Sequence, residues 1–267
     1  MRPTLVLVKS DLRRERWALL ALAVALFALQ VLAVWVARTL DAGDTYRKLA
    51  ALAPDFARRG AGFDLAVLLS FTGGVGIGYF HPVVTAALVA AAMTAAKGPI
   101  ADLDGGGAAL FLARPVPRWA LMARSLIELG FLAVALPAVM LLGTTAGLVL
   151  VGRFATTSLM PFARLALNDA ALVLSLGAVA ALLAAVSTRT RGYTRATLAF
   201  ALVSYLADYL ARVWPPLRPL GPLALFHYLE PARVLGGAPM AANLAVLAAV
   251  TCAASGAALY LFERRDL

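Results

Sequence analysis

The stretch WALLALAVALFALQVLAVWVA, residues 17–37, contains a single polar side chain, Gln30, in 21 positions. A bilayer core about 30 Å thick is crossed by about 20 apolar helical residues. The stretch therefore predicts a membrane-spanning helix. It follows a basic segment, as the core of a signal peptide does, but it is longer than the roughly 7–15 residues of such a core, and no clear small-residue cleavage site closes it. We expect it to be retained as a span.

Five further apolar runs meet the same length test, at residues 72–96, 127–151, 170–187, 196–213 and 241–262. Lipid offers no water to unpaired backbone groups, so runs rich in Ala, Leu and Val span it as helices. The predicted fold class is all-α: a polytopic membrane protein with six transmembrane helices. No repeat or separable soluble segment is visible, and residues 1–267 are expected to form one transmembrane domain.

The composition supports this class, because 62% of the residues are hydrophobic, 14% are charged and the mean hydropathy is +0.85. Soluble domains have about 45–50% apolar and about 25% charged residues. The net charge of +10 comes from basic residues that flank apolar runs, which indicates anionic lipid and topology rather than nucleic acid. One side of the six spans receives 14 of the 24 Lys and Arg residues and the other 10, so both termini are expected in the cytoplasm and the protein in the cell (inner) membrane.

Three connections have distinct patterns. Residues 1–16 carry apolar side chains on one helical side and basic ones on another, which predicts an amphipathic helix at the headgroups. Residues 97–119 form a cytoplasmic loop, and residues 214–240 an outer loop whose prolines forbid a continuous helix and whose residues 223–229 could dip into the membrane edge. In the second span, Gly74 and Gly78 predict close helix packing, or a local break before His81-Pro82.

The chain offers few groups for chemistry. Among its lysines only Lys9 precedes a serine, and Val8 stands where a P-loop requires glycine, so no nucleotide site is expected in this chain. Its two histidines, His81 and His227, are far apart in sequence and the motif H-E-x-x-H is absent, so no metal or other cofactor site is expected either. The ionisable residues Glu128 and Asp208 lie near the ends of spans, one helical turn from Arg124 and Arg212 respectively. We expect interfacial ion pairs there; either acid would line a polar pathway if it faced the interior.

The loop between the second and third spans contains an acidic-glycine segment, a short apolar patch and the turn LARPVPRW at residues 112–119. This order resembles the inner loop of permease subunits of ATP-binding-cassette transporters of the ABC-2 type. Two other stretches are similar to that family: FHYLEPARVLGG at residues 226–237, and LFERRDL at residues 261–267. The residues of the loop that match are Asp102, Asp104, Gly105, Gly106, Leu112, Ala113, Arg114, Pro115, Val116, Arg118 and Trp119.

The resemblance covers essentially the whole chain. It implies a permease subunit of an exporter, with two copies of a separate P-loop ATPase that uses ATP and Mg²⁺, a second permease copy as a homodimer, and surrounding lipid as partners. It also implies an ATPase interface formed by Asp102, Asp104, Gly105, Gly106, Leu112, Arg114, Pro115 and Arg118. The chain itself would not be an enzyme.

Two alternatives remain open. An intramembrane enzyme would require groups such as His81, Glu128 and Asp208 to converge. A membrane scaffold or assembly factor would bind partners without transporting anything. The sequence identifies no substrate.

Overall fold

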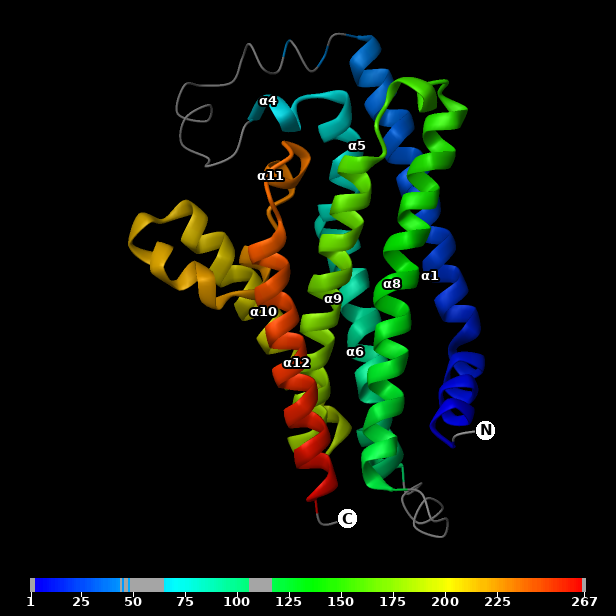
Figure 1. The fold of residues 1–267 in the computed structure, drawn as a ribbon, viewed down its shortest axis with the longest axis vertical. Coiled ribbons are helices and arrows are strands. Elements are labelled where there is room, and N and C mark those ends of the chain that lie inside the picture. The colour runs from blue at the N-terminus through cyan, green and yellow to red at the C-terminus, as the bar shows by residue number, and fades with distance from the viewer. Residues whose placement is uncertain (1–2, 44, 46–47, 49–64, 106–116, 266–267) are drawn as a thin grey trace.

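The structure is a computed structural model that describes residues 3–43, 45, 48, 65–105 and 117–265. Over these residues the chain is helical, without strands, and six helical segments are long and apolar enough to cross a membrane. All six predicted spans are therefore confirmed. All of these segments except residues 190–213 stand side by side along one axis, and the start of the first and the end of the last lie at the same end of the molecule (Figure 1). We call this end the terminal end of the molecule and the opposite end the distal end.

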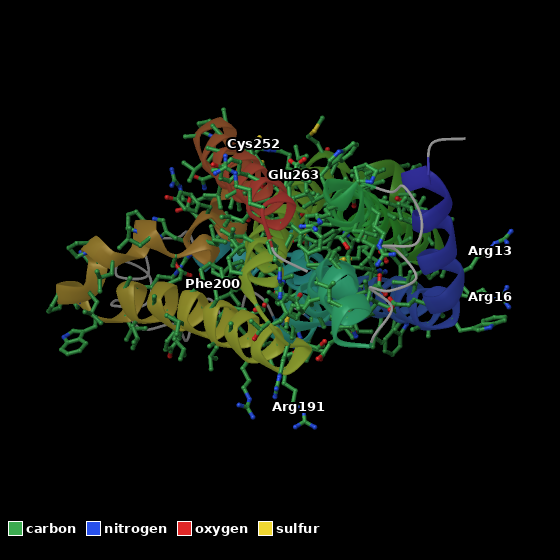
Figure 2. The ribbon with its side chains drawn as sticks, turned by 90° about the horizontal axis from the view of Figure 1, so that it is seen from below. Arg13, Arg16, Arg191, Phe200, Cys252 and Glu263 are labelled. Atoms are coloured by element: carbon green, nitrogen blue, oxygen red, sulfur yellow. The ribbon has the colours of Figure 1, made fainter. Side chains whose placement is uncertain are left out.

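Helix α1, Pro3–Ala42, joins the predicted interfacial segment to the first span without interruption. Figure 2, seen from below, shows the first turns of α1 lengthwise, so they lie across the axis of the bundle. The side chains of Arg13 and Arg16 point away from the helices there. This arrangement suits a segment that rests at the headgroups before the chain enters the bilayer.

The second span is broken at His81 into α5, Phe71–Phe80, and α6, Pro82–Asp104. His81 has an extended backbone, its Nδ1 accepts a hydrogen bond from Val83 N at 3.3 Å, and Pro82 brings no N–H to continue α5. A Cβ on Gly78 would lie 2.5 Å from Gln30 Oε1 of α1, so α5 and α1 approach closely. The close packing and the break, two readings of one sequence feature, are both present.

Helices α8, Arg118–Leu150, and α9, Met160–Val186, form the centre of the bundle. The short turns α4, Leu65–Leu68, and η1, Phe154–Thr156, lie at the distal end. On one side α8 packs along α1, and on the other α9 packs against α6, α8 and α12, Ala241–Glu263. Of the six candidate spans α9 is the most enclosed, because 61% of the residues in its apolar 18-residue stretch are buried.

Helix α10, Thr190–Val213, leans away from the long axis, and with η2, Pro215–Leu223, it forms a lobe on the side of the bundle (Figures 1 and 2). The chain returns through η3, Leu225–Tyr228, and α11, Pro231–Leu235, to α12. The prediction that residues 214–240 form no continuous helix is confirmed. The buried face of α10 is largely polar; its members are Tyr193, Thr197, Ser204, Asp208 and Ala211.

The loop expected at residues 97–119 is shorter than predicted. Helix α6 continues to Asp104, where the backbone N–H of Gly105 bonds to the carbonyls of Ala101 and Leu103, and α8 begins at Arg118. The helix passes the predicted boundary because its polar residues Lys97 and Asp102 are at a helix end, where water and partner charges solvate them. Of the predicted interface, Gly106, Leu112, Arg114 and Pro115 lie outside the described residues.

Candidate functional site

A buried ion pair lies at the terminal end, between α6 and α8. Arg124 of α8 donates to Asp102 Oδ2, and the arginine is 3% exposed. Gly98 makes room for it, because a Cβ there would lie 3.2 Å from Arg124 Nη2 and 3.0 Å from Ser125 Oγ. A buried arginine without its carboxylate would be an uncompensated charge, so the pair fixes the end of α6 against α8.

The next acid of the predicted interface contacts α10. Asp104 Oδ2 accepts a hydrogen bond from the backbone N–H of Thr190 at 3.1 Å. Arg189, the residue before α10, makes no side-chain cap, so Asp104 supplies the acceptor that a helix N-terminus needs. Two carboxylates two positions apart in α6 thus bind two different helices.

The other end of the loop is also tied. Arg118, the first residue of α8, donates through Nη1 to the carbonyl of Arg265, just beyond α12. The Nη1 of Arg265 in turn donates a hydrogen bond of 3.4 Å to the carbonyl of Ala185, near the end of α9. The two ends of the loop are therefore connected to α8, α10 and the segment after α12. The resemblance implies that Asp102, Asp104 and Arg118 contact a partner ATPase, which stays a prediction, whereas their contacts with other helices were not predicted from the sequence.

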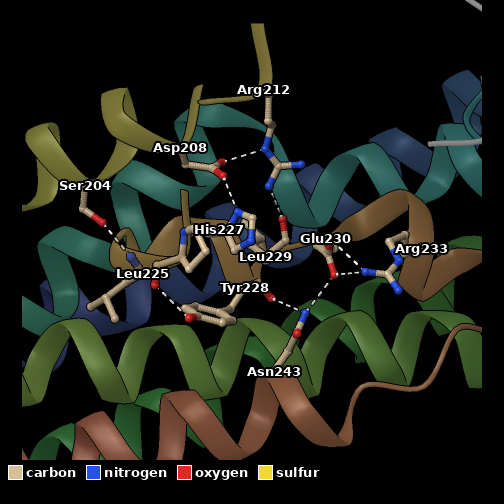
Figure 3. A network of polar contacts seen from close by, with 11 residues as sticks. Ser204, Asp208, Arg212, Leu225, His227, Tyr228, Leu229, Glu230, Arg233 and Asn243 are labelled. Carbon is tan, nitrogen blue, oxygen red and sulfur yellow. Dashed lines mark hydrogen bonds and ion pairs between the residues drawn. The ribbon is translucent and has the colours of Figure 1, made fainter. Parts of the chain in front are cut away.

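A second polar cluster lies at the base of the lobe (Figure 3). Asp208 Oδ2 accepts from Arg212 Nε at 2.9 Å, which confirms the predicted pair in the fifth span. His227 Nδ1 lies 3.4 Å from Asp208 Oδ1, and Arg212 Nη2 lies 3.4 Å from the carbonyl of Leu229. Ser204 Oγ accepts from the backbone N–H of Leu225 at 2.9 Å. These contacts hold η3 against α10.

The cluster continues to α11 and α12 through Glu230. Its carboxylate accepts from Arg233 Nη1 at 2.9 and 3.0 Å and from Asn243 Nδ2 at 2.9 Å. Burial opposes the charged form, but the hydrogen bonds of Asn243 and Arg233 outweigh it and lower the pKa of Glu230 below its ordinary value. Asn168 of α9 donates to the carbonyl of Tyr228 at 3.2 Å. Four elements are thereby joined at the distal side.

A third polar cluster lies inside the bundle. Tyr79 of α5 and Thr144 of α8 share a hydrogen bond of 2.9 Å, and Thr144 Oγ1 lies 3.4 Å from Gln30 Oε1 of α1. Asp169 of α9 is 3% exposed, and its Oδ2 has no hydrogen-bond partner. Asp169 was not predicted as a site residue, because it lies one position before the fourth predicted span, which begins at residue 170. The rule that ionisable residues within spans are functional candidates would have found it.

The remaining candidates have the following places. Glu128 is buried on α8, one turn after Arg124, and its role as a pathway residue stays a prediction. His81 is exposed and caps α6, so it is not brought together with Asp208, which is paired on α10. Within the described residues no group of three or more His, Cys, Asp or Glu side chains could hold a metal ion. A small apolar cavity between α6, α9 and α10 is lined by Val89, Ala92, Met93, Leu176, Thr197, Phe200 and Ala201.

The chain matches no protein-family model and no curated protein.

Proposed function

We propose that this multi-pass membrane protein is the permease subunit of an ATP-driven exporter of the ABC-2 type. A separate P-loop ATPase, in two copies, supplies the energy from Mg²⁺-ATP, and a second copy of the permease completes the pathway in the cell membrane. The proposal rests on the resemblance of the loop, the distal segment and the tail to that family, and it agrees with the six apolar helices. The chain has no catalytic role in it.

The contacts at the two ends of the loop between α6 and α8 are the main structural support for the proposal. The loop between α6 and α8 begins and ends at side chains that bind other helices: Asp102 binds α8, Asp104 binds α10, and Arg118 binds the segment after α12. A partner that moves this loop would therefore move the ends of several spans together.

Helix α10 is the element through which such a movement would reach the far side. Its first residue, Thr190, is bound by Asp104, the helix leans away from the bundle, and a cavity remains between it and α6 and α9. At its other end Asp208 and Arg212 hold η3. A partner drives the movement only if it binds the loop differently in its two nucleotide states. Export follows when that difference opens a path beside α10.

Purification tests the partner. The tagged protein, taken from its native membranes in mild detergent, is expected to bring down a P-loop ATPase at equal stoichiometry, identified by mass spectrometry. Repeated well-folded preparations without an ATPase would overturn the proposal. Stable partners without any ATP-dependent change in the permease would favour the scaffold reading.

A charge reversal tests the loop. Arg114→Glu is expected to leave the complex able to hydrolyse ATP but to abolish the ATP-dependent change in amide hydrogen exchange of α10. Arg195→Glu is the matched control, because it makes the same charge change at an exposed position of α10 outside the loop. An unchanged response in Arg114→Glu would count against the coupling role of the loop.

The enzyme alternative has no support from the geometry. His81 and Asp208 have structural partners on different helices. Alanine substitutions at His81, Glu128 and Asp208 that leave function intact would remove this alternative.

A further inference from the structure

Asp169 is an acid in the interior of the most enclosed helix. It lies nine residues after Met160, about 13 Å along α9 at 1.5 Å per residue, and is 3% exposed. The adjacent Asn168 is also buried, but the residues one turn away on α9, Leu165, Ala166, Leu172 and Val173, are apolar. Tyr79 of α5 stacks on Phe162 of the same face at 6.4 Å and lies within electrostatic reach of Asp169.

In the part of the chain that the structure describes, no cation balances this carboxyl group. Among the described residues none forms an ion pair with Asp169, and its Oδ2 is buried without a hydrogen-bond partner. Three other acids of the described residues contrast with it, because Asp102, Asp208 and Glu230 each pair with an arginine. A carboxylate removed from water without a partner is strongly disfavoured, whereas its protonated form is neutral.

The charged and titratable groups of the surrounding elements are occupied elsewhere. Arg164 of α9 donates to the carbonyl of Ala238, Arg233 of α11 pairs with Glu230, and His227 of η3 faces Asp208. On α10, Asp208 and Arg212 pair with each other. Tyr79 is the titratable residue of α5. The ionisable residues of α6 and α8, among them Arg124 and Glu128, lie outside residues 82–96 and 129–150 of these helices, which contain no Asp, Glu, Lys, Arg or His, and neither do residues 241–262 of α12.

We propose that Asp169 is a proton-binding site inside the bundle. In the closed packing of α5 against α9 its carboxylate holds one proton taken from water, which forms the neutral acid at neutral pH. When α9 and α5 separate and water enters, the carboxyl group returns that proton to water and becomes charged. Proton uptake and release thus accompany closing and opening of this part of the protein. This inference is independent of the ATPase partner and holds for any function of the chain.

Two measurements on the purified full-length protein test it. Dicyclohexylcarbodiimide, which adds to protonated carboxyl groups in apolar surroundings, is expected to modify Asp169 at neutral pH, with the adduct located by peptide mass spectrometry. The paired acids Asp41 and Glu230 serve as internal controls and should stay unmodified. This labelling needs no variant. Loss of labelling when sodium is added at constant pH would show a metal cation in place of the proton and would overturn the assignment.

Infrared difference spectra decide the protonation state if the reagent fails to reach the site. The wild-type minus Asp169→Asn spectrum at neutral pH should contain the C=O band of a protonated carboxylic acid, shifted in heavy water. Carboxylate bands in its place overturn the proposal. Asp169→Asn is neutral and of the same shape, so it should unfold at the same temperature as the wild type. Asp102→Asn removes a paired charge and should unfold at a lower temperature.

Discussion

Gly143 lies where α8 meets the backbone of α1. A Cβ at this position would be 2.6 Å from the carbonyl oxygen of Phe27 and 3.1 Å from its Cα, and backbone atoms cannot move aside as a side chain end can. Gly143→Ala is therefore expected to destabilise the protein by about 1–3 kcal/mol, as overpacking does elsewhere. The unfolding temperature in detergent measures this.

Gly130 provides the control on the same helix, because no atom lies within 4 Å of the Cβ it lacks. Gly130→Ala should leave the unfolding temperature unchanged or raise it slightly, since alanine favours helices. If both variants lowered the unfolding temperature equally, α8 and α1 would not be in close contact at Gly143.

The contribution of Glu230 to stability is expected to depend on pH. Its lowered pKa means that its interactions stabilise the protein above the ordinary value of 4.5 and are lost as the pH falls through the lower value in the folded protein. Glu230→Gln should cost about 1 kcal/mol near neutral pH, because the bonds of Arg233 and Asn243 weaken, and the difference from the wild type should vanish in acid. Thermal unfolding across this pH range tests it.

Glu263→Gln is the control, since Glu263 is exposed at the end of α12. If the stability difference between the wild type and Glu230→Gln grew as the pH fell, its pH dependence would be opposite to the one expected. That result would contradict the assignment of partners to Glu230.

At the scale of single elements, α10 depends on a residue of another helix for its first turn. Asp104→Ala removes the acceptor for Thr190 N, so the amides at the start of α10 should exchange hydrogen faster, while those of α9 keep their rates. Asp41→Ala is the matched control, because it removes an acid that pairs with Arg153 at the distal end. Hydrogen exchange measured by mass spectrometry distinguishes the two. Equal rates at Thr190 in Asp104→Ala and the wild type would exclude the capping role.

Most elements, but few of their contacts, follow from local sequence. The long apolar runs predicted all six spans, and Pro82 after His81 predicted the break between α5 and α6. The Arg212–Asp208 pair was predictable because four residues make one helical turn. The contacts of Asp102 and Asp104 were not, since they join residues 22 and 86 positions apart, and only packing brings these together.

At the scale of the molecule, three polar clusters are placed at different depths of an otherwise apolar bundle. One ties α6 to α8 and α10, one holds the lobe, and one lies inside with Asp169. Helix α10 runs from Thr190, which Asp104 binds, past Asp208, so a single helix connects the first two clusters. If a partner displaces one end of α10, we expect contacts at the other end to change, as the proposed transport requires.

The orientation of the chain in the membrane is expected from its distribution of basic residues. The excess of Lys and Arg at one end predicts that the terminal end lies in the cytoplasm, where positive residues are retained. Single cysteines introduced in a Cys252→Ala background test this, because Cys252 is exposed on α12 and is the only native cysteine. Arg218→Cys in the lobe should react with a membrane-impermeant maleimide applied to intact cells. Arg191→Cys, which replaces a side chain that points outward at the terminal end, should react only after the membrane is opened (Figure 2). The reverse pattern would place the loop after α6 outside the cell, out of reach of any cytoplasmic ATPase, and would overturn the proposed function together with the orientation.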